Sequence, residues 1–352
     1  MNLFKRETST VGLDIGSHSI KLVKLRHARS GDYILEAMGK WDLKPGVVEN
    51  GEIKNKESLK EAITTLVNQC DPSIVDVVIS MSGNAMLSEK FTFNIDHNDN
   101  TEETILWEAS QKSPFDVDDI TLDYKILKEF PEKNQIEVLL VAAKNQIMQN
   151  YIDLLYEVGL RPVIVDVETF ALYNCVSLET TADAAHEGVT ALLNIGHNHT
   201  NVTFFKDGIY HSSRDMNTAG SFFAKTVSRQ LSVTEEAAAD MIRGKGDVPD
   251  KALLAKSLEY AAEEISSFVD LAFSYFRSTE KSDKIDQIVL SGGGAYLPGL
   301  TKLLSERHNT SVRISNPLAH LVYDPGLFRG IDPRTVSGFM TIAIGLALRK
   351  AV

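Results

Sequence analysis

Hydrophobic and polar positions alternate along the chain in two patterns. Short runs rich in β-branched residues predict strands, and longer segments with apolar residues three or four positions apart predict amphipathic helices. The predicted helices share apolar faces within residues 59–70, 147–158 and 258–276. Strands that alternate with helices indicate an α/β fold built in layers. The predicted strands cover residues 11–13, 20–25, 75–80, 137–142, 163–167, 189–195, 201–205 and 285–290.

Two further helices are predicted from local signals. Ser232 and Glu235 have capping-box spacing, so a helix should begin there and continue to about residue 243. A run of small and apolar residues predicts a last helix over residues 337–348.

Residues 85–159 have the pattern of an inserted subdomain. The segment predicts a polar strand that ends near Ile95, a helix that opens within residues 100–103, two strands that meet around residues 132–134, and a final helix.

Length and charge narrow the class of protein. The 352 residues allow two domains, and a net charge of −12 disfavours binding to nucleic acid. Two cysteines, Cys70 and Cys175, without a metal-binding motif fit a reducing compartment. Residues 1–10 lack the apolar core of a signal peptide, and the apolar stretch 340–348 is too short to span a bilayer. We therefore expect a cytoplasmic protein that reaches a membrane only through a partner.

A first glycine turn joins the strands predicted at 11–13 and 20–25. Gly16 would let a ligand approach the backbone, the groups of Ser17 to Ser19 could cradle phosphate oxygens, and Lys21 could balance phosphate charge. Asp14 is expected to have no cation of its own nearby and so to suit the water shell of Mg²⁺. A plain β-hairpin is an equally good explanation of this motif alone.

Two later glycine turns could also bring backbone and polar groups close to a ligand. Asn194, Gly196 and Thr200 lie in a second turn between strands, with polar groups at matching places. Gly292 to Gly294 end a buried strand, where bare backbone can lie against a flat ring or a phosphate. A tight structural connection would also explain three glycines.

In order and spacing, the three turns resemble the superfamily of actin, sugar kinases and DnaK-type chaperones over nearly the whole chain. The resemblance implies the α/β actin/hexokinase/DnaK-type ATPase fold, with ATP and Mg²⁺ bound in a cleft between two domains. It divides the chain into residues 1–84, 160–185 and 336–352 for the first domain, 85–159 for the insertion, and 186–335 for the second domain.

Residues 11–25 and 166–172 resemble the corresponding stretches of the PilM family of type IV pilus assembly proteins. The insertion is similar to the FtsA-type 1C (SHS2) subdomain, but the chain stops at residue 352 without the amphipathic tail of FtsA. The resemblance implies an adaptor that binds the N-terminal cytoplasmic tail of a PilN-like inner-membrane protein, and it leaves self-association open.

By the same resemblance Glu168 would position water, Asp14 would hold Mg²⁺ through water, and Asp166 would contribute to the metal site. The residues expected nearest to ATP are Asp14, Gly16, Ser17, Ser19, Lys21, Asn194, Gly196, Thr200, Gly292, Gly293 and Gly294.

Some positions depart from the superfamily pattern. Asn194 stands where an aspartate is usual, and Thr169 stands where the PilM family has proline, so we expect slow hydrolysis or none. His18, His197 and His199 are expected to donate hydrogen bonds near phosphate rather than to hold a metal. Two other functions remain open: a filament-forming, FtsA-like cytoskeletal ATPase, and a small-molecule kinase of the same fold.

Overall fold

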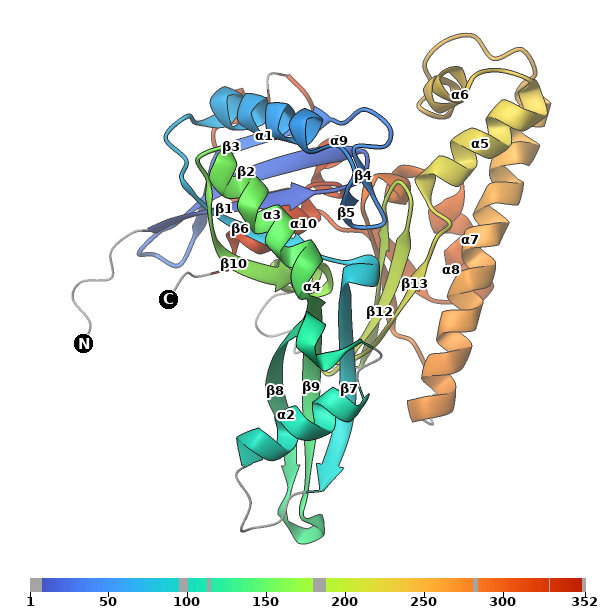
Figure 1. Cartoon of the computed structure of the whole chain (residues 1–352). Coiled ribbons are helices and arrows are strands. Elements are labelled where there is room, and N and C mark those ends of the chain that lie inside the picture. Colours follow the sequence, from blue (N-terminus) through green and yellow to red (C-terminus); the bar gives the residue numbers. More distant parts are fainter. Residues whose placement is uncertain are drawn as a thin grey trace.

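The computed structural model describes residues 8–94, 101–112, 115–179, 188–280, 284–328 and 330–349. Three units are visible in Figure 1: two layered α/β units side by side, and a smaller unit that projects away from both. In the described part of the chain, no helix is long and apolar enough to cross a bilayer.

The first unit is built on a six-stranded sheet in the order β10-β6-β1-β2-β3-β16. Strands β1 to β3 are antiparallel neighbours, while β6 runs parallel to β1 and β10 parallel to β6. Helices α1 (Lys56–Cys70) and α3 (Asn145–Glu157) pack against one face of this sheet. The strands are β1 (Thr8–Ile15), β2 (Ser19–His27), β3 (Tyr33–Asp42), β6 (Asp76–Met81), β10 (Arg161–Val167) and β16 (Val322–Tyr323).

The second unit repeats this plan with a five-stranded sheet in the order β13-β12-β11-β14-β15. Here too the first three strands are antiparallel neighbours and the later two are parallel additions. Its core is rich in phenylalanine from β12, α5 and α7. The elements are β11 (Val189–Ile195), β12 (Thr200–Lys206), β13 (Ile209–Met216), β14 (Gln287–Ser291), β15 (Ser311–Ile314), α5 (Gly220–Leu231), α6 (Glu235–Ile242), α7 (Lys251–Glu280) and α8 (Leu300–His308).

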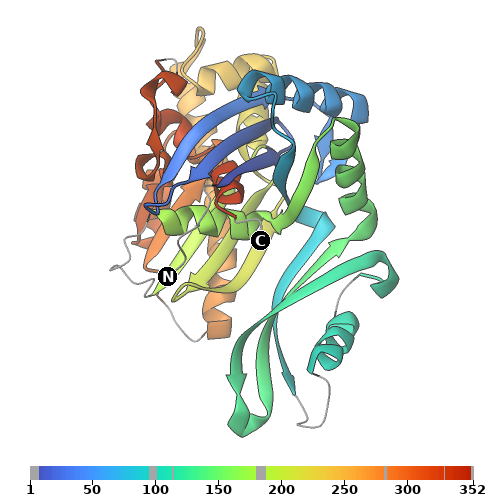
Figure 2. The same ribbon diagram turned by 90° about the vertical axis from the view of Figure 1, so that its left-hand side faces the viewer.

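The projecting unit is a three-stranded antiparallel sheet with one helix on it (Figure 2). Strands β7 (Met86–Asn94), β9 (Gln135–Lys144) and β8 (Ile120–Phe130) follow in that spatial order. Ile105 of α2 (Thr101–Lys112) is buried against Phe93, Ile136 and Val138 of the sheet. The expected insertion of strand, helix, two strands and helix is thus present, although Ile95 lies outside the described residues.

Two helices connect the two large sheets. Helix α4 (Glu168–Leu178) and helix α10 (Thr341–Ala347) share one core with both sheets, which includes Leu172 and Leu346 as well as Leu192 of β11. The helices cross closely: a Cβ on Gly345 would lie 1.8 Å from the carbonyl oxygen of Ala171. Any movement of the two sheets relative to each other must therefore involve this pair.

Each predicted strand is confirmed, but two helix predictions are wrong in detail. Helix α6 is capped by Thr234, whose hydroxyl accepts from the amide of Ala237 at 3.2 Å; Ser232 instead ends α5 in a left-handed conformation. The helix predicted over 337–348 is shorter than expected: α10 begins at Thr341, and Ser337 is instead the last residue of a separate short helix, α9 (Arg334–Ser337). The chain also contains the short strands β4 (Val48–Glu49) and β5 (Glu52–Ile53).

Candidate functional site

The first turn joins β1 and β2. The amide of Gly16 donates to the carbonyl of Ser19 at 3.2 Å, which closes the turn. The antiparallel register pairs Asp14 with Lys21, and Lys21 Nζ lies 2.9 Å from Asp14 Oδ2. The expectation that Asp14 has no cation nearby is therefore wrong, because residues seven apart in sequence become direct neighbours in this hairpin. Burial raises the pKa of Asp14, while Lys21 lowers it. Ser17 is half-buried at the tip of the turn.

The second turn, between β11 and β12, has the same construction. The amide of Gly196 donates to the carbonyl of His199 at 3.0 Å, just as Gly16 does to Ser19. Thr200, however, is fully buried and its hydroxyl donates to the carbonyl of Thr218 at 2.8 Å. In this structure the hydroxyl of Thr200 thus connects the turn to the segment that precedes α5 by a hydrogen bond.

The tips of the two turns touch. The rings of His18 and His197 stack with their centroids 4.3 Å apart and an angle of 18° between the ring planes. Burial lowers the pKa of both histidines, that of His197 to about 4, so both rings are neutral at pH 7. Sequence reasoning gave no sign of this stack, because it depends on how the two units face each other.

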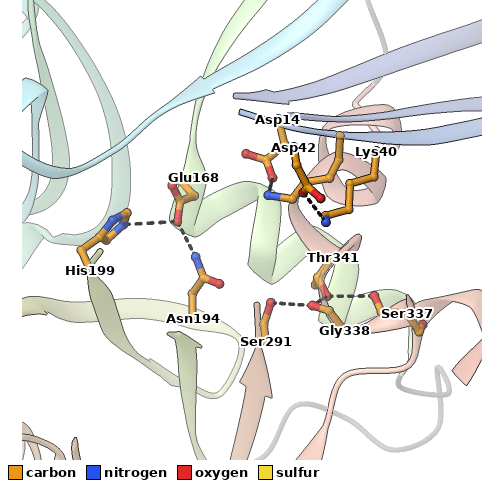
Figure 3. A network of polar contacts seen from close by, with 11 residues as sticks. Asp14, Lys40, Asp42, Glu168, Asn194, His199, Ser291, Ser337, Gly338 and Thr341 are labelled. Carbon is orange, nitrogen blue, oxygen red and sulfur yellow. Dashed lines mark hydrogen bonds and ion pairs between the residues drawn. The ribbon is translucent and has the colours of Figure 1, made fainter. Parts of the chain in front are cut away.

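Glu168 bridges the two units at the base of the turns (Figure 3). It is the first residue of α4, and its Oε1 accepts a hydrogen bond from Nδ2 of Asn194 at the end of β11. His199 Nε2 lies 3.8 Å from the same oxygen, an ion-pair distance. Burial alone would raise the pKa of Glu168, but His199, Ser82 and Asn194 together lower it to about 2. Glu168 therefore stays ionised and engaged at neutral pH.

The third turn packs against the second. Gly292 has φ +81°, and a Cβ there would lie 2.4 Å from the carbonyl oxygen of Ile195. A Cβ on Gly294 would lie 2.2 Å from Ile195 Cγ2, whereas one on Gly293 would meet no described atom within 4 Å. The fold itself thus excludes side chains at two of the three glycines, and Gly293 alone of the three leaves open space above the backbone.

The third turn is also tied to the first unit through one carbonyl group. The carbonyl oxygen of Gly338 accepts from the amide of Gly292 at 2.9 Å, from Ser291 Oγ at 3.3 Å and from Thr341 Oγ1 at 2.8 Å. These bonds explain why the predicted last helix is interrupted here: the carbonyl serves the turn, and α10 begins with Thr341.

Asp166 is placed differently from the other predicted residues. Its carboxylate is buried at the end of β10, where Oδ1 accepts the amide of Val167 at 2.9 Å and Oδ2 lies 3.0 Å from Nε of Arg349. Burial raises its pKa, and Arg349 opposes that shift. The described residues contain no group of three or more His, Cys, Asp or Glu side chains around a possible ion.

A cavity of about 550 Å³ opens where the three units meet. Its walls come from the start of β7, the beginning of α4 and strand β13, and both Glu168 and His199 line it. Tyr210 of β13 donates a hydrogen bond to the carbonyl of Ser88 in β7 at 2.8 Å, which joins the projecting unit to the second unit beside the cavity. Sequence analysis did not identify this cavity, because its walls come from distant parts of the chain.

Two sheets of one plan, joined by a pair of crossing helices and carrying facing glycine turns, define an actin-like ATPase fold. Solved structures share it. The ethanolamine utilization protein EutJ from Carboxydothermus hydrogenoformans is 12% identical with a TM-score of 0.58, covering 97% of this chain and 89% of that one. MreB5 of Spiroplasma citri, bound to AMPPNP, is 11% identical with a TM-score of 0.51, covering 96% and 94%.

A more specific match identifies the family. Residues 12–351 match the model of the type IV pilus assembly protein PilM, and the chain belongs to that family. The structure is also similar to a chain in a PilM–PilN type IV pilus biogenesis complex, with 23% identity and a TM-score of 0.84, covering 97% of this chain and 98% of that chain. The resemblance to PilM and the actin-like fold expected from the glycine turns are thereby confirmed.

Proposed function

We propose that this protein is an ATP-binding cytoplasmic adaptor of type IV pilus assembly, which binds the N-terminal tail of a PilN-like inner-membrane protein. Membership of the PilM family over residues 12–351 carries the proposal. The similar PilM chain was solved in a complex with PilN, which supports a partner of that kind here. Contact with the membrane would then come through the partner.

The cleft between the facing turns is the proposed ATP site. The amides beside Gly16 and Gly196 and the side chain of Lys21 would bind phosphate oxygens, and Asp14 would orient the waters of Mg²⁺. The open backbone at Gly293 would accommodate the nucleoside. Lys21, which pairs with Asp14 in this structure, would exchange that anionic partner for the phosphate oxygens of bound ATP.

We expect hydrolysis to be slow or absent. Asn194 is a neutral amide and cannot act as a base, and Oε1 of Glu168 already accepts from Asn194 and lies at ion-pair distance from His199. Phosphate release from ATP, measured for the wild type and for Asn194→Asp, tests this expectation. Turnover by the wild type at the rates of about 1–100 s⁻¹ that are typical of kinases would contradict it.

The cavity beside β7 and β13 is the proposed site for the partner's tail. Its volume of about 550 Å³ lies within the range of about 300–1,000 Å³ that is usual for ligand pockets. One wall belongs to the projecting unit, through residues of β7 and Glu137 of β9. Since the other walls come from α4 and the second sheet, movement of the two sheets would reshape the site.

Two titrations test the proposal. Calorimetry should show that ATP binds the wild type and that Lys21→Ala loses about ten- to hundred-fold in affinity, because a charged contact of about 1.5–3 kcal/mol is removed. A labelled tail peptide of about ten residues should bind the wild type in a fluorescence titration. Absence of ATP binding would remove the nucleotide part of the proposal, and absence of peptide binding would remove the adaptor part.

A paired substitution tests the location of the peptide. Glu89 lines the cavity, while Glu103 is exposed on α2 and does not line it. The chain's net charge of −12 favours a tail that carries Lys or Arg. We therefore expect Glu89→Ala to lower the affinity for the tail peptide several-fold and Glu103→Ala to leave that affinity unchanged. Equal effects of the two substitutions would place the peptide elsewhere.

A further inference from the structure

His199 belongs to two parts of the molecule at once. Its backbone carbonyl closes the second glycine turn, and its imidazole lines the cavity. The Nε2 atom is buried and makes no hydrogen bond with any described residue; it lies 3.8 Å from Glu168 Oε1. The position of the imidazole thus depends on its charge and on the backbone of the turn. A small displacement of the turn, or of a group in the cavity, can therefore alter the contact between His199 and Glu168.

The environment of His199 makes it a cation. Burial alone would lower its pKa, but the ion pair with Glu168 and the nearby carboxylates of Asp215 and Asp14 raise it to about 9. The interaction with Glu168 is therefore one between full charges at neutral pH. Two charges at this distance in a partly buried place interact far more strongly than they would in water.

Glu168 transmits any such change to the cleft. It begins α4, the helix that packs against both large sheets, and its Oε1 also accepts a hydrogen bond from Asn194. Figure 3 shows Asp14, Glu168 and Asn194 arranged around one region between the ribbons, with His199 on the outer side of Glu168. The Glu168–His199 pair therefore lines the cavity, and through Glu168 it contacts Asn194, one of the residues of the proposed ATP site.

We propose that the ion pair between Glu168 and His199 couples the nucleotide cleft to the cavity, with His199 as the positioning residue. This inference rests on the proposed function, because it requires both ligands. A peptide side chain that enters the cavity contacts the imidazole directly and shifts the charge that holds Glu168. A nucleotide that moves Glu168 or the second turn reaches the imidazole through the same contact.

Coupling is measured as the ratio of the ATP dissociation constants without and with saturating tail peptide. For the wild type we expect this ratio to differ from one by a factor of at least about five. For His199→Gln we expect it to stay within about two-fold of one, which means that coupling is lost. The matched control is His308→Gln, because His308 Nε2 lies 3.7 Å from Asp270 Oδ1, a similar distance from a carboxylate, and neither of these residues lines the cavity. That control should keep the wild-type ratio. A structural defect would weaken binding without setting the ratio to one.

Thermal melts show whether each variant is folded. If His199→Gln does not fold, Glu168→Gln replaces it: the amide keeps the shape and can still accept from Asn194, but it lacks the charge that pairs with His199, so coupling should again be lost. A folded variant of either kind that retains the wild-type ratio overturns the inference alone. A wild type that binds neither ATP nor the peptide overturns the proposed function and this inference with it.

Discussion

At the scale of single residues, the chain neutralises its own anions in the cleft. Lys21 pairs with Asp14, and His199 pairs with Glu168. A cleft with these charges unpaired would be costly, because desolvated carboxylates need a cation or several hydrogen bonds. In the proposed function, Lys21 would exchange Asp14 for phosphate oxygens of the nucleotide.

The three glycines of the third turn give a sharp prediction. Gly293→Ala should fold normally, because no described atom lies within 4 Å of the added methyl group, and it should bind ATP at least ten-fold more weakly if the nucleoside lies against this backbone. Gly294→Ala should instead unfold at lower temperature, since its methyl group would lie 2.2 Å from Ile195 Cγ2. Thermal melts and ATP calorimetry separate the two. Unchanged ATP affinity in Gly293→Ala would move the nucleoside elsewhere.

The pair between Glu168 and His199 predicts a pH dependence of stability. Because folding raises the pKa of His199 to about 9, its contribution is complete below the ordinary histidine pKa of about 6.5 and is lost as pH rises through 9. Glu168, with a pKa near 2, stays charged throughout this range.

The measurement is urea unfolding at pH 6.5 and pH 9.5 for the wild type and His199→Gln. The wild type should lose about 1–3 kcal/mol more than the variant between the two values. Other groups titrate equally in both proteins, so equal losses would show that folding does not raise the pKa of His199.

Sequence reasoning located most of the turn residues but not their partners. Gly16, Lys21, Asn194 and Gly196 lie in the facing turns as expected. The partner of Glu168 could not be found in this way, because His199 is 31 positions away and meets it through the packing of two units. Asp166 shows the converse: a strand-end aspartate has the expected position, but its carboxylate is taken by Arg349 from the end of the chain.

At the scale of elements, periodicity was sufficient for many strands and helices with one buried face, although it gave no prediction for α5, which buries Phe223 and Val227. It found β1, β2, β6, β9, β10, β11, β12 and β14, and it found the helices α1, α3 and α7. It missed β3, β13 and β15, which are edge strands or lie next to the short edge strand β16, so that partial exposure leaves their apolar residues less regular. Boundaries set by side-chain caps were also less certain than the elements themselves.

The start of α6 gives the prediction at this scale. Thr234→Ala should lower the free energy of unfolding by about 1 kcal/mol, because the hydroxyl accepts from the amide of Ala237. Ser232 has φ +55° at the end of α5, so Ser232→Gly should be neutral or stabilising. Denaturant unfolding of both variants is the check. A larger loss for Ser232→Gly than for Thr234→Ala would restore Ser232 as the cap.

At the scale of the whole molecule, the start of α4 adjoins both the cavity and the second glycine turn. The cavity has walls in all three units, and α4 and α10 connect the two large sheets with little free space at Gly345. Tightly packed elements change arrangement as bodies, so a shift at one side of α4 is felt at the other. A ligand that favours one arrangement of the sheets will therefore change the affinity of the other site.

This linkage predicts a reciprocal effect in the wild type. If ATP strengthens binding of the tail peptide by some factor, the peptide must strengthen binding of ATP by the same factor, and couplings of this kind are typically about 5- to 150-fold. Calorimetry measures the dissociation constant for ATP with and without peptide, and fluorescence measures the dissociation constant for the peptide with and without ATP. Added salt should slow association of a basic peptide with this chain of charge −12. Peptide affinity that does not change with ATP would separate the two sites and leave the adaptor without control by nucleotide.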